Sequence, residues 1–118
     1  MRSYKSFNQI YLYNAQVDFR KSINGLMQIV KFQMNLNPLE EGSLFIFVAR
    51  NRWALKTLYF DHSGFALWYK RLEGEKFKLP KPNSSSHSLT SKELGLFLEG
   101  YDIFKMKPHK ILGEDALF

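Results

Sequence analysis

The order of apolar and polar residues between positions 43 and 80 predicts most of a β-sheet. Runs rich in aromatic and aliphatic residues are separated by the turn segments 50–52, 61–64 and 73–75. Short runs of this composition between turn residues are typical of antiparallel strands. The longest run, 44–49, is apolar throughout, which predicts a central strand covered on both faces.

A turn at residues 61–64 defines the register of one hairpin. The predicted pairs on one face are Phe60–Phe65, Leu58–Leu67 and Lys56–Tyr69, and on the other face Tyr59–Ala66, Thr57–Trp68 and Leu55–Lys70. The first face is mostly apolar, whereas the second mixes aromatic, hydroxyl and ammonium groups. A slip of one residue would exchange the two faces. Residues 76–79 alternate between charged and apolar residues, which predicts an edge strand closed by Pro80.

Two further patterns predict helices. Asp18 is expected to cap a first helix, whose apolar stripe recurs at steps of three and four: Phe19, Ile23, Leu26, Val30 and Met34. Thr90 and Glu93 form a capping box for a second helix, which ends before Gly100. With a short apolar strand at 9–13, the elements predict an α+β fold. We expect an antiparallel β-meander sheet of about five strands with two helices packed on one face.

Length and composition are those of one folded domain. The chain has 118 residues, enough for one core. We expect residues 1–118 to form a single domain, with 1–8 and 101–118 as less ordered tails and 81–88 as a polar connection. Cysteine is absent, which excludes disulfides and cysteine-based metal sites. No signal peptide or membrane-spanning run is seen, so we expect a cytoplasmic protein with no membrane partner.

The sequence contains no recognisable catalytic set. The histidines His62, His87 and His109 show no zinc-site spacing. The acidic residues available for a metal-binding triad are Asp18, Asp61 and Glu73, and their predicted positions do not converge. Asp61 and His62 are better explained as turn formers than as an acid–base pair. We therefore expect no enzymatic activity, no metal or other cofactor, and no small-molecule substrate.

Positive charge and aromatic residues coincide in the strand region. The formal net charge of +6 favours a polyanionic partner, although many small basic proteins bind none. Lysine and arginine contact phosphates, and tryptophan stacks on bases. The residues concerned are Arg50, Arg52, Trp53, Lys56, Trp68, Lys70 and Arg71, with Lys76, Lys78 and Lys81 beside them. The structural alternative places both tryptophans in the core and Lys56 over the Tyr69 ring, and leaves the other cations solvated.

Three stretches also carry a family resemblance: VDFRKSINGL at 17–26, the long run at 44–80, and LTSKELGLFLEG at 89–100. They resemble the small accessory protein of the insertion-sequence-66 family of bacterial transposable elements, the TnpB product of the second reading frame. The family's motifs match Asp18, Arg20 and Lys21, then Phe45, Phe47, Arg50 and Arg52, then Lys56, Leu58, Asp61 and Gly64, and finally residues 68–73. Asn51 and Trp53 depart from the pattern, and the match ends near Tyr101.

The resemblance implies a role in DNA transposition, and hence DNA recombination, beside a separate catalytic transposase. It supplies no catalytic residues. The matching basic residues are Arg20, Lys21, Arg50, Arg52, Lys56, Lys70 and Arg71.

Two hypotheses follow for the function. In the first, a non-enzymatic accessory protein contacts the element-end DNA through a basic, aromatic sheet face that includes Trp68. In the second, a protein-interaction module docks on the transposase or regulates it without binding DNA. An exposed Trp68 beside Lys56 and Lys70 would favour DNA. A buried Trp68 with an exposed apolar patch elsewhere would favour a protein partner.

Overall fold

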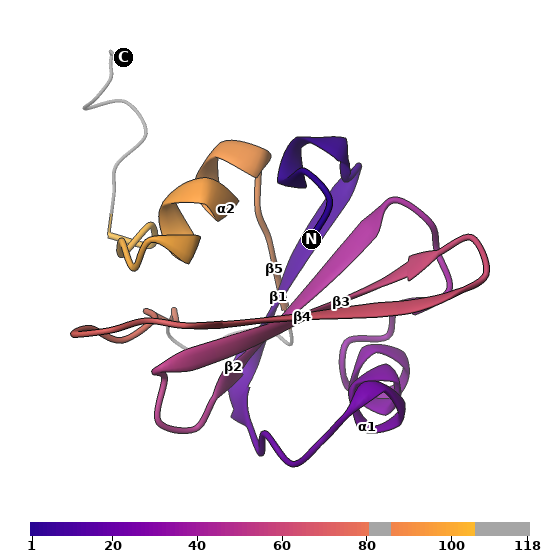
Figure 1. The fold of residues 1–118 in the computed structure, drawn as a ribbon, viewed down its shortest axis with the longest axis horizontal. Coiled ribbons are helices and arrows are strands. Elements are labelled where there is room, and N and C mark those ends of the chain that lie inside the picture. Colours follow the sequence, from indigo (N-terminus) through magenta and orange to yellow (C-terminus); the bar gives the residue numbers. More distant parts are fainter. Residues whose placement is uncertain (81–85, 106–118) are drawn as a thin grey trace.

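The computed structural model describes residues 1–80 and 86–105 and shows one sheet between two helices (Figure 1). The elements are η1 (Tyr4–Ser6), β1 (Gln9–Val17), α1 (Ile23–Gln28), the π-helical segment η2 (Ile29–Gln33), β2 (Ser43–Ala49), β3 (Ala54–Asp61), β4 (Gly64–Arg71), β5 (Ser86–Ser88) and α2 (Ser91–Leu98). The predicted α+β class, with five strands and two helices, is confirmed. Residues 81–85 of the predicted connection and 106–118 of the predicted tail lie outside the described residues.

The sheet is mixed, with the strand order β4-β3-β2-β1-β5. β2, β3 and β4 form the predicted antiparallel meander. β1 is parallel to β2, because the helical connection between them returns the chain to the end where β1 began. The prediction of a fully antiparallel sheet is therefore wrong for the pair β1 and β2.

The fifth strand is β5, and the predicted edge strand at 76–79 does not form. Residues Ser86–Ser88 have no apolar alternation, and they become a strand by pairing with Tyr11–Tyr13 of β1. In the predicted edge segment, Phe77 is fully buried, and its N–H donates to the carbonyl of Arg52 at 2.7 Å. This segment therefore closes over the end of the sheet and does not extend its edge.

The two helices cover opposite faces of the sheet, which corrects the prediction that both lie on one face (Figure 1). Every residue of β2 is buried. Because successive side chains of a strand point to opposite faces, both faces of β2 must be covered. Ile46 and its neighbours two positions away pack toward α2 and its Phe97. Phe45 and Phe47 pack toward α1 and its Leu26. A central strand that is apolar on both faces needs a helix on each.

The hairpin of β3 and β4 has the predicted register. Asp61 is opposite Gly64, Lys56 is opposite Tyr69, and Thr57 is opposite Trp68. His62 occupies the turn with a φ of 52°, in the left-handed region. The pairing therefore places Lys56 and Trp68 on opposite faces of the sheet, since they belong to neighbouring pairs.

The first helix begins later than predicted, whereas the second is capped as predicted. α1 starts after Ser22, because the Asp18 carboxylate accepts the backbone N–H of Arg20 at 2.9 Å in a local turn. In the second helix, the N–H of Thr90 donates to Glu93 Oε1 at 2.8 Å, and the N–H of Glu93 donates to Thr90 Oγ1 at 3.0 Å. The capping box is confirmed.

Candidate nucleic-acid interface

The turn between β2 and β3 carries Arg50 and Arg52. The N–H of Arg52 donates to the carbonyl of Ala49 at 2.9 Å, and the N–H of Trp53 donates to Asn51 Oδ1 at 2.9 Å. Arg52 has a φ of 63°, a conformation that costs about 1–2 kcal/mol for a residue with a side chain. The local hydrogen bonds hold this turn with Arg50 exposed and Arg52 partly exposed.

The segment between β1 and α1 lies beside this turn and is held there by Lys56. The Lys56 ammonium donates to the carbonyls of Phe19 and Lys21, both at 2.9 Å. It also lies 4.8 Å from the centre of the Phe19 ring, so Phe19, and not the expected Tyr69, is its aromatic partner. The Phe19 ring in turn lies 6.0 Å from that of Tyr69. Lys56 therefore positions the segment that carries Arg20 and Lys21.

The charges of the two segments influence one another. Hydrogen bonds from the Arg20 guanidinium and backbone hold the pKa of the Asp18 carboxyl well below its usual range, and the positive charge of Arg50 adds to the effect. Lys21 and Arg50 line one groove of ≈ 450 Å³ together with Asp18. The groove thus brings basic residues distant in sequence onto one surface.

Trp53 lies on the other side of the β2–β3 turn, among basic residues. It lines a groove of ≈ 460 Å³ with Arg71 and Glu73. The Lys76 ammonium is 5.8 Å from the centre of the Trp53 ring, and Arg71 Nε donates to Glu73 at 2.9 Å. Trp53 is partly exposed at this surface.

We call the basic residues at this end of the sheet the basic rim: Arg20, Lys21, Arg50, Arg52, Arg71 and Lys76. Arg20 and Arg71 form ion pairs with Asp18 and Glu73. Within residues 1–80 and 86–105, Lys21, Arg50 and Arg52 form no ion pair. Their positive charge is therefore not compensated by a direct ion pair, and this end of the sheet can attract an anion.

Trp68 and Lys70 lie away from the basic rim, on the face covered by α2. Trp68 is partly buried against the hydrophobic cluster that includes Phe97. The Lys70 ammonium lies 3.5 Å from a carboxylate oxygen of Glu99, just after α2. The structure thus gathers Arg20, Lys21, Arg50, Arg52 and Arg71 at one end and separates them from Trp68 and Lys70.

The family model described as IS66 Orf2 like protein (TnpB_IS66) matches residues 8–108. The chain belongs to this family. Membership implies an accessory role in the transposition of an insertion sequence. The match includes the whole basic rim, from Arg20 to Lys76.

Two relatives come from Sinorhizobium fredii (strain NBRC 101917 / NGR234). "Uncharacterized protein y4jC" is 31% identical over 99 residues, which cover 84% of each chain. "Uncharacterized protein y4hO" is 29% identical over 94 residues, which cover 80% of this chain and 81% of the relative. No solved structure matches this IS66 Orf2-like chain significantly.

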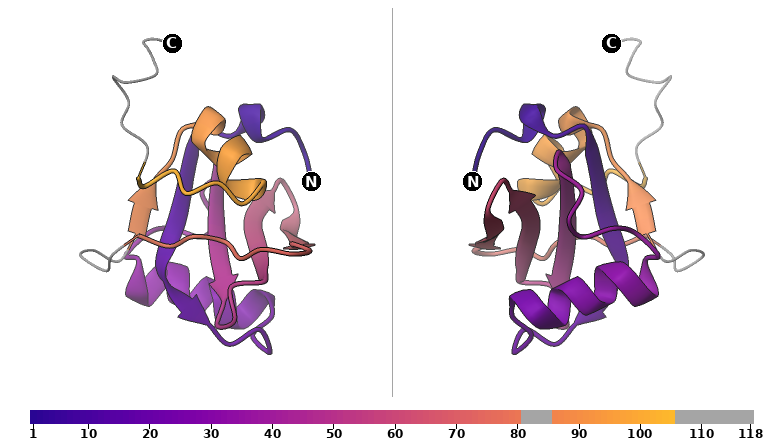
Figure 2. Two further views of the ribbon diagram at one scale, coloured as in Figure 1. Left: turned by 90° about the vertical axis from the view of Figure 1, so that its left-hand side faces the viewer. Right: turned by 90° about the vertical axis from the view of Figure 1, so that its right-hand side faces the viewer.

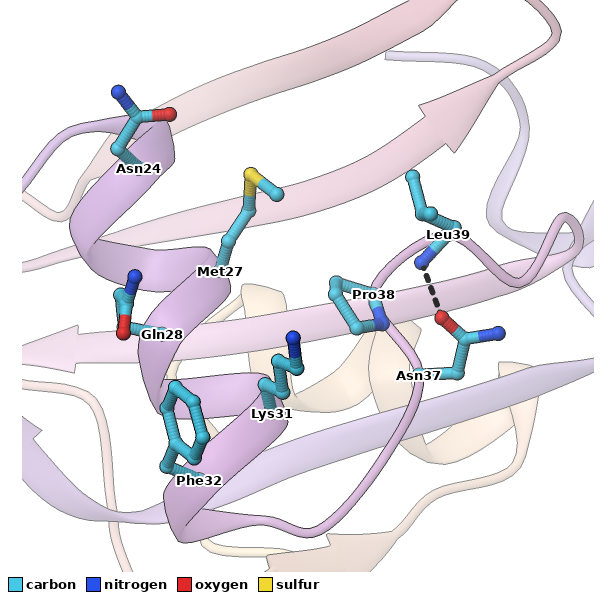
Figure 3. A pocket seen from close by; sticks show the side chains of 8 residues that line it. All are labelled: Asn24, Met27, Gln28, Lys31, Phe32, Asn37, Pro38 and Leu39. Atoms are coloured by element: carbon cyan, nitrogen blue, oxygen red, sulfur yellow. Dashed lines mark hydrogen bonds between the residues drawn. The ribbon is translucent and has the colours of Figure 1, made fainter.

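This IS66 Orf2-like chain also has a groove with exposed apolar side chains, which the sequence patterns did not reveal (Figure 3). The groove of ≈ 510 Å³ lies between the first helix and the following loop. Phe32 of η2 is 61% exposed and Leu39 of the loop is 53% exposed. Phe32 lies outside the predicted apolar stripe of the first helix. This position was the sequence feature that could have indicated the groove, because an apolar residue on the polar face of a helix does not pack into the core.

The described part of this family member shows neither a metal site nor a membrane-spanning helix. In residues 1–80 and 86–105, no group of three or more His, Cys, Asp or Glu side chains is placed to hold a metal ion. None of the helices described is long and apolar enough to cross a membrane.

Proposed function

We propose that this protein is a non-enzymatic accessory protein of transposition that binds DNA through the basic rim. The β2–β3 turn supports the proposal most directly. This turn carries Arg50, which shares a groove with Lys21, and Arg52, and no acidic side chain of the described residues forms an ion pair with either arginine. Unpaired cations at a surface bind phosphates and release the counterions of DNA, which favours association.

Trp53 is the aromatic residue of the proposed interface. It lies beside Arg71 and Lys76 and is partly exposed. Its ring can stack on an unpaired base while the neighbouring cations contact the backbone. Trp68 and Lys70 are left out of the interface, because α2 and Glu99 engage them on the other face.

Fluorescence anisotropy across a salt series tests this proposal. The probes are a labelled element-end duplex, an unrelated duplex and a single strand. If about five phosphates are contacted, the logarithm of the association constant falls with the logarithm of salt concentration at a slope near −4.5 for duplex DNA. A preference for the element end would show sequence reading, and a preference for the single strand would support base stacking on Trp53.

Charge-reversal variants locate the interface. The double variant Arg50→Glu with Arg52→Glu is expected to weaken DNA binding at least about tenfold at low salt, because phosphate contacts are replaced by repulsion. Lys5→Glu with Lys92→Glu makes the same change in net charge at exposed positions in η1 and α2. Circular dichroism should show both variants folded. Equal losses in the two double variants would reduce the effect to overall charge and contradict the assigned interface.

The alternative function is docking on the transposase without DNA contact. The groove of Figure 3 favours it, and so does Trp68, which is partly buried and lies on the face opposite Lys56. Met27 and Lys31 lie across this groove from Leu39, and an exposed apolar surface of this kind is typical of protein-binding sites. No binding of any DNA at low salt, together with transposase binding that Phe32→Ser abolishes, would favour this alternative over the DNA interface.

A further inference from the structure

Among residues 1–80 and 86–105, β4 forms one edge of the sheet and pairs with β3 alone (Figure 2). It is eight residues long and keeps an unbroken register with its neighbour. The opposite edge is formed by β5, which has only three residues. The two edges therefore differ, since a very short edge strand offers little backbone for pairing with another chain.

The hydrogen-bonding pattern shows which β4 backbone groups face outward. Just beyond the paired residues, the N–H of Leu72 donates to the carbonyl of Trp53 at 2.8 Å. Hydrogen-bonded and non-hydrogen-bonded pairs alternate along an antiparallel ladder, so Lys70 and every second residue before it bond to β3. The residues whose backbone groups point away from the sheet are therefore Phe65, Leu67, Tyr69 and Arg71.

This edge lacks the features that usually prevent edge strands from pairing. Residues 64–69 contain no charged residue and no proline, and their register with β3 shows no bulge. Charged residues, Lys70 and Arg71, occur only at the end of the strand. No residue of β4 is fully buried, and Tyr69 is 54% exposed. The side chains beside the free backbone thus have apolar surface that a further strand would cover.

We propose that β4 pairs in antiparallel orientation with β4 of a second copy, which makes one continuous sheet across a twofold axis. In this arrangement Phe65 is opposite Arg71 of the other copy, and Leu67 is opposite Tyr69. The twofold axis repeats each of these hydrogen-bonded pairs once. Trp68 then faces Trp68 of the second copy across the axis. The ladder with β3 determines which backbone groups of β4 face outward. Among the antiparallel registers, we choose this one because it pairs all of them.

Charge distribution favours a second copy in this orientation. The cations Lys70 and Arg71 lie at one end of β4, and Gly64 lies at the other. Antiparallel pairing keeps the cations of the two copies apart, whereas parallel pairing would place them side by side. It also sets the Arg71 guanidinium against an aromatic ring, Phe65, which is a favourable contact. The inference does not depend on DNA binding.

Sedimentation equilibrium of the full chain tests the proposal with two matched variants. Tyr69 and Tyr101 are 54% and 53% exposed, and Tyr69 is opposite Lys56, so a glutamate at either position should be tolerated by the fold. We expect the unmodified protein to dimerise and Tyr69→Glu to raise the dimer dissociation constant at least about tenfold, because a carboxylate would face Leu67 of the other copy. Tyr101→Glu should leave dimerisation unchanged. A monomer at all concentrations, or equal effects of both variants, would overturn the proposal.

Cysteine cross-linking tests the register, since the chain contains no natural cysteine. Hydrogen-bonded antiparallel pairs have Cα atoms about 5.5 Å apart, a distance that a disulfide can span. A mixture of Leu67→Cys and Tyr69→Cys proteins should form a mixed disulfide dimer under mild oxidation. Each variant alone should form far less. A mixed yield no higher than that of a Tyr101→Cys control, or equal self-linking of Leu67→Cys, would refute the proposed pairing.

Discussion

Lys56 and Arg50 are both cations near one end of the sheet, yet their surroundings give them different roles. The Lys56 ammonium is engaged by the carbonyls of Phe19 and Lys21 and by the Phe19 ring. Arg50 is exposed and affects its neighbours mainly through its charge, as its influence on Asp18 shows. Residue type supplies a cation, and the neighbouring groups decide whether it is free to bind an anion.

Arg52 allows stability to be separated from binding. Arg52→Gly removes the backbone strain of a φ of 63°, which stabilises the folded state. Glycine also increases the conformational entropy of the unfolded chain, which favours unfolding. Because these effects oppose each other, the free energy of unfolding should stay within about 0.5 kcal/mol of wild type in urea denaturation. DNA affinity should fall, as one phosphate contact is lost. Arg52→Ala keeps the strain and should lose the same affinity. Unchanged DNA binding by both variants would remove Arg52 from the interface.

Asp18 gives a prediction about pH. Its folded-state pKa is lowered, chiefly by hydrogen bonds from Arg20, so the unfolded chain takes up its proton first as the pH falls. The stabilisation is therefore fully present above about pH 5, and it declines below about pH 4 toward the folded-state pKa. NMR titration should find Asp18 still ionised at about pH 3, where an ordinary aspartate is mostly protonated. In Asp18→Asn this pH dependence should be absent. A normal Asp18 titration would contradict the ion pair.

Among the elements, the segment between β1 and α1 shows how a side chain can replace regular structure. Residues 18–22 form neither a helix nor a strand, and they remain beside the sheet through bonds to Lys56 of β3. The Asp18 carboxylate completes the local turn by accepting from Arg20. As a result, α1 begins at Ile23 and not directly after Asp18 as predicted.

Replacing Lys56 should release this segment. Lys56→Met retains much of the apolar side-chain volume and removes both hydrogen bonds, so unfolding free energy should fall by about 2–3 kcal/mol. DNA affinity should decrease because Arg20 and Lys21 are less well positioned, but the salt slope should barely change if the same phosphates are contacted. Lys31→Met is the control, as Lys31 is exposed and its ammonium lies 5.5 Å from the adjacent Phe32 ring. A flatter salt slope in Lys56→Met would instead show direct phosphate contact.

At the scale of the whole molecule, the sheet separates two hydrophobic clusters, and the segment after β4 connects one of them to the basic rim. Phe77 is fully buried and its ring stacks on that of Phe97 in α2, with centres 5.6 Å apart. Its N–H also donates to the carbonyl of Arg52. The position of the β2–β3 turn therefore depends on packing beneath α2.

Phe77→Ala tests this connection. Loss of a fully buried aromatic ring should reduce the free energy of unfolding by about 3–4 kcal/mol. Amide hydrogen exchange in the β2–β3 turn should rise more than in β1, because the turn loses its support. Leu79→Ala changes a partly buried residue two positions later and should have a smaller effect on both measurements. Equal exchange changes in the turn and in β1 would indicate only a general loss of stability.

The sequence predicted those features that depend on residues close together along the chain. The turn at 61–64 defined the β3–β4 register, and the Thr90–Glu93 box defined the start of α2. The uniform apolar run at 44–49 indicated a strand buried on both faces. Local periodicity, turn chemistry and capping are sufficient for such features, because each is decided within a few residues.

The tertiary structure decided what depends on distant partners. Ser86–Ser88 is a strand only because β1 offers an edge, and the helices lie on opposite faces only because β2 has to be covered twice. The motif basic residues were known from the sequence, but their separation into the basic rim and the face with Lys70 follows from pairing and packing. Which cations are neutralised is set by neighbours such as Glu99 that are remote in sequence. Since electrostatic interactions act through space, their outcome cannot be read along one chain.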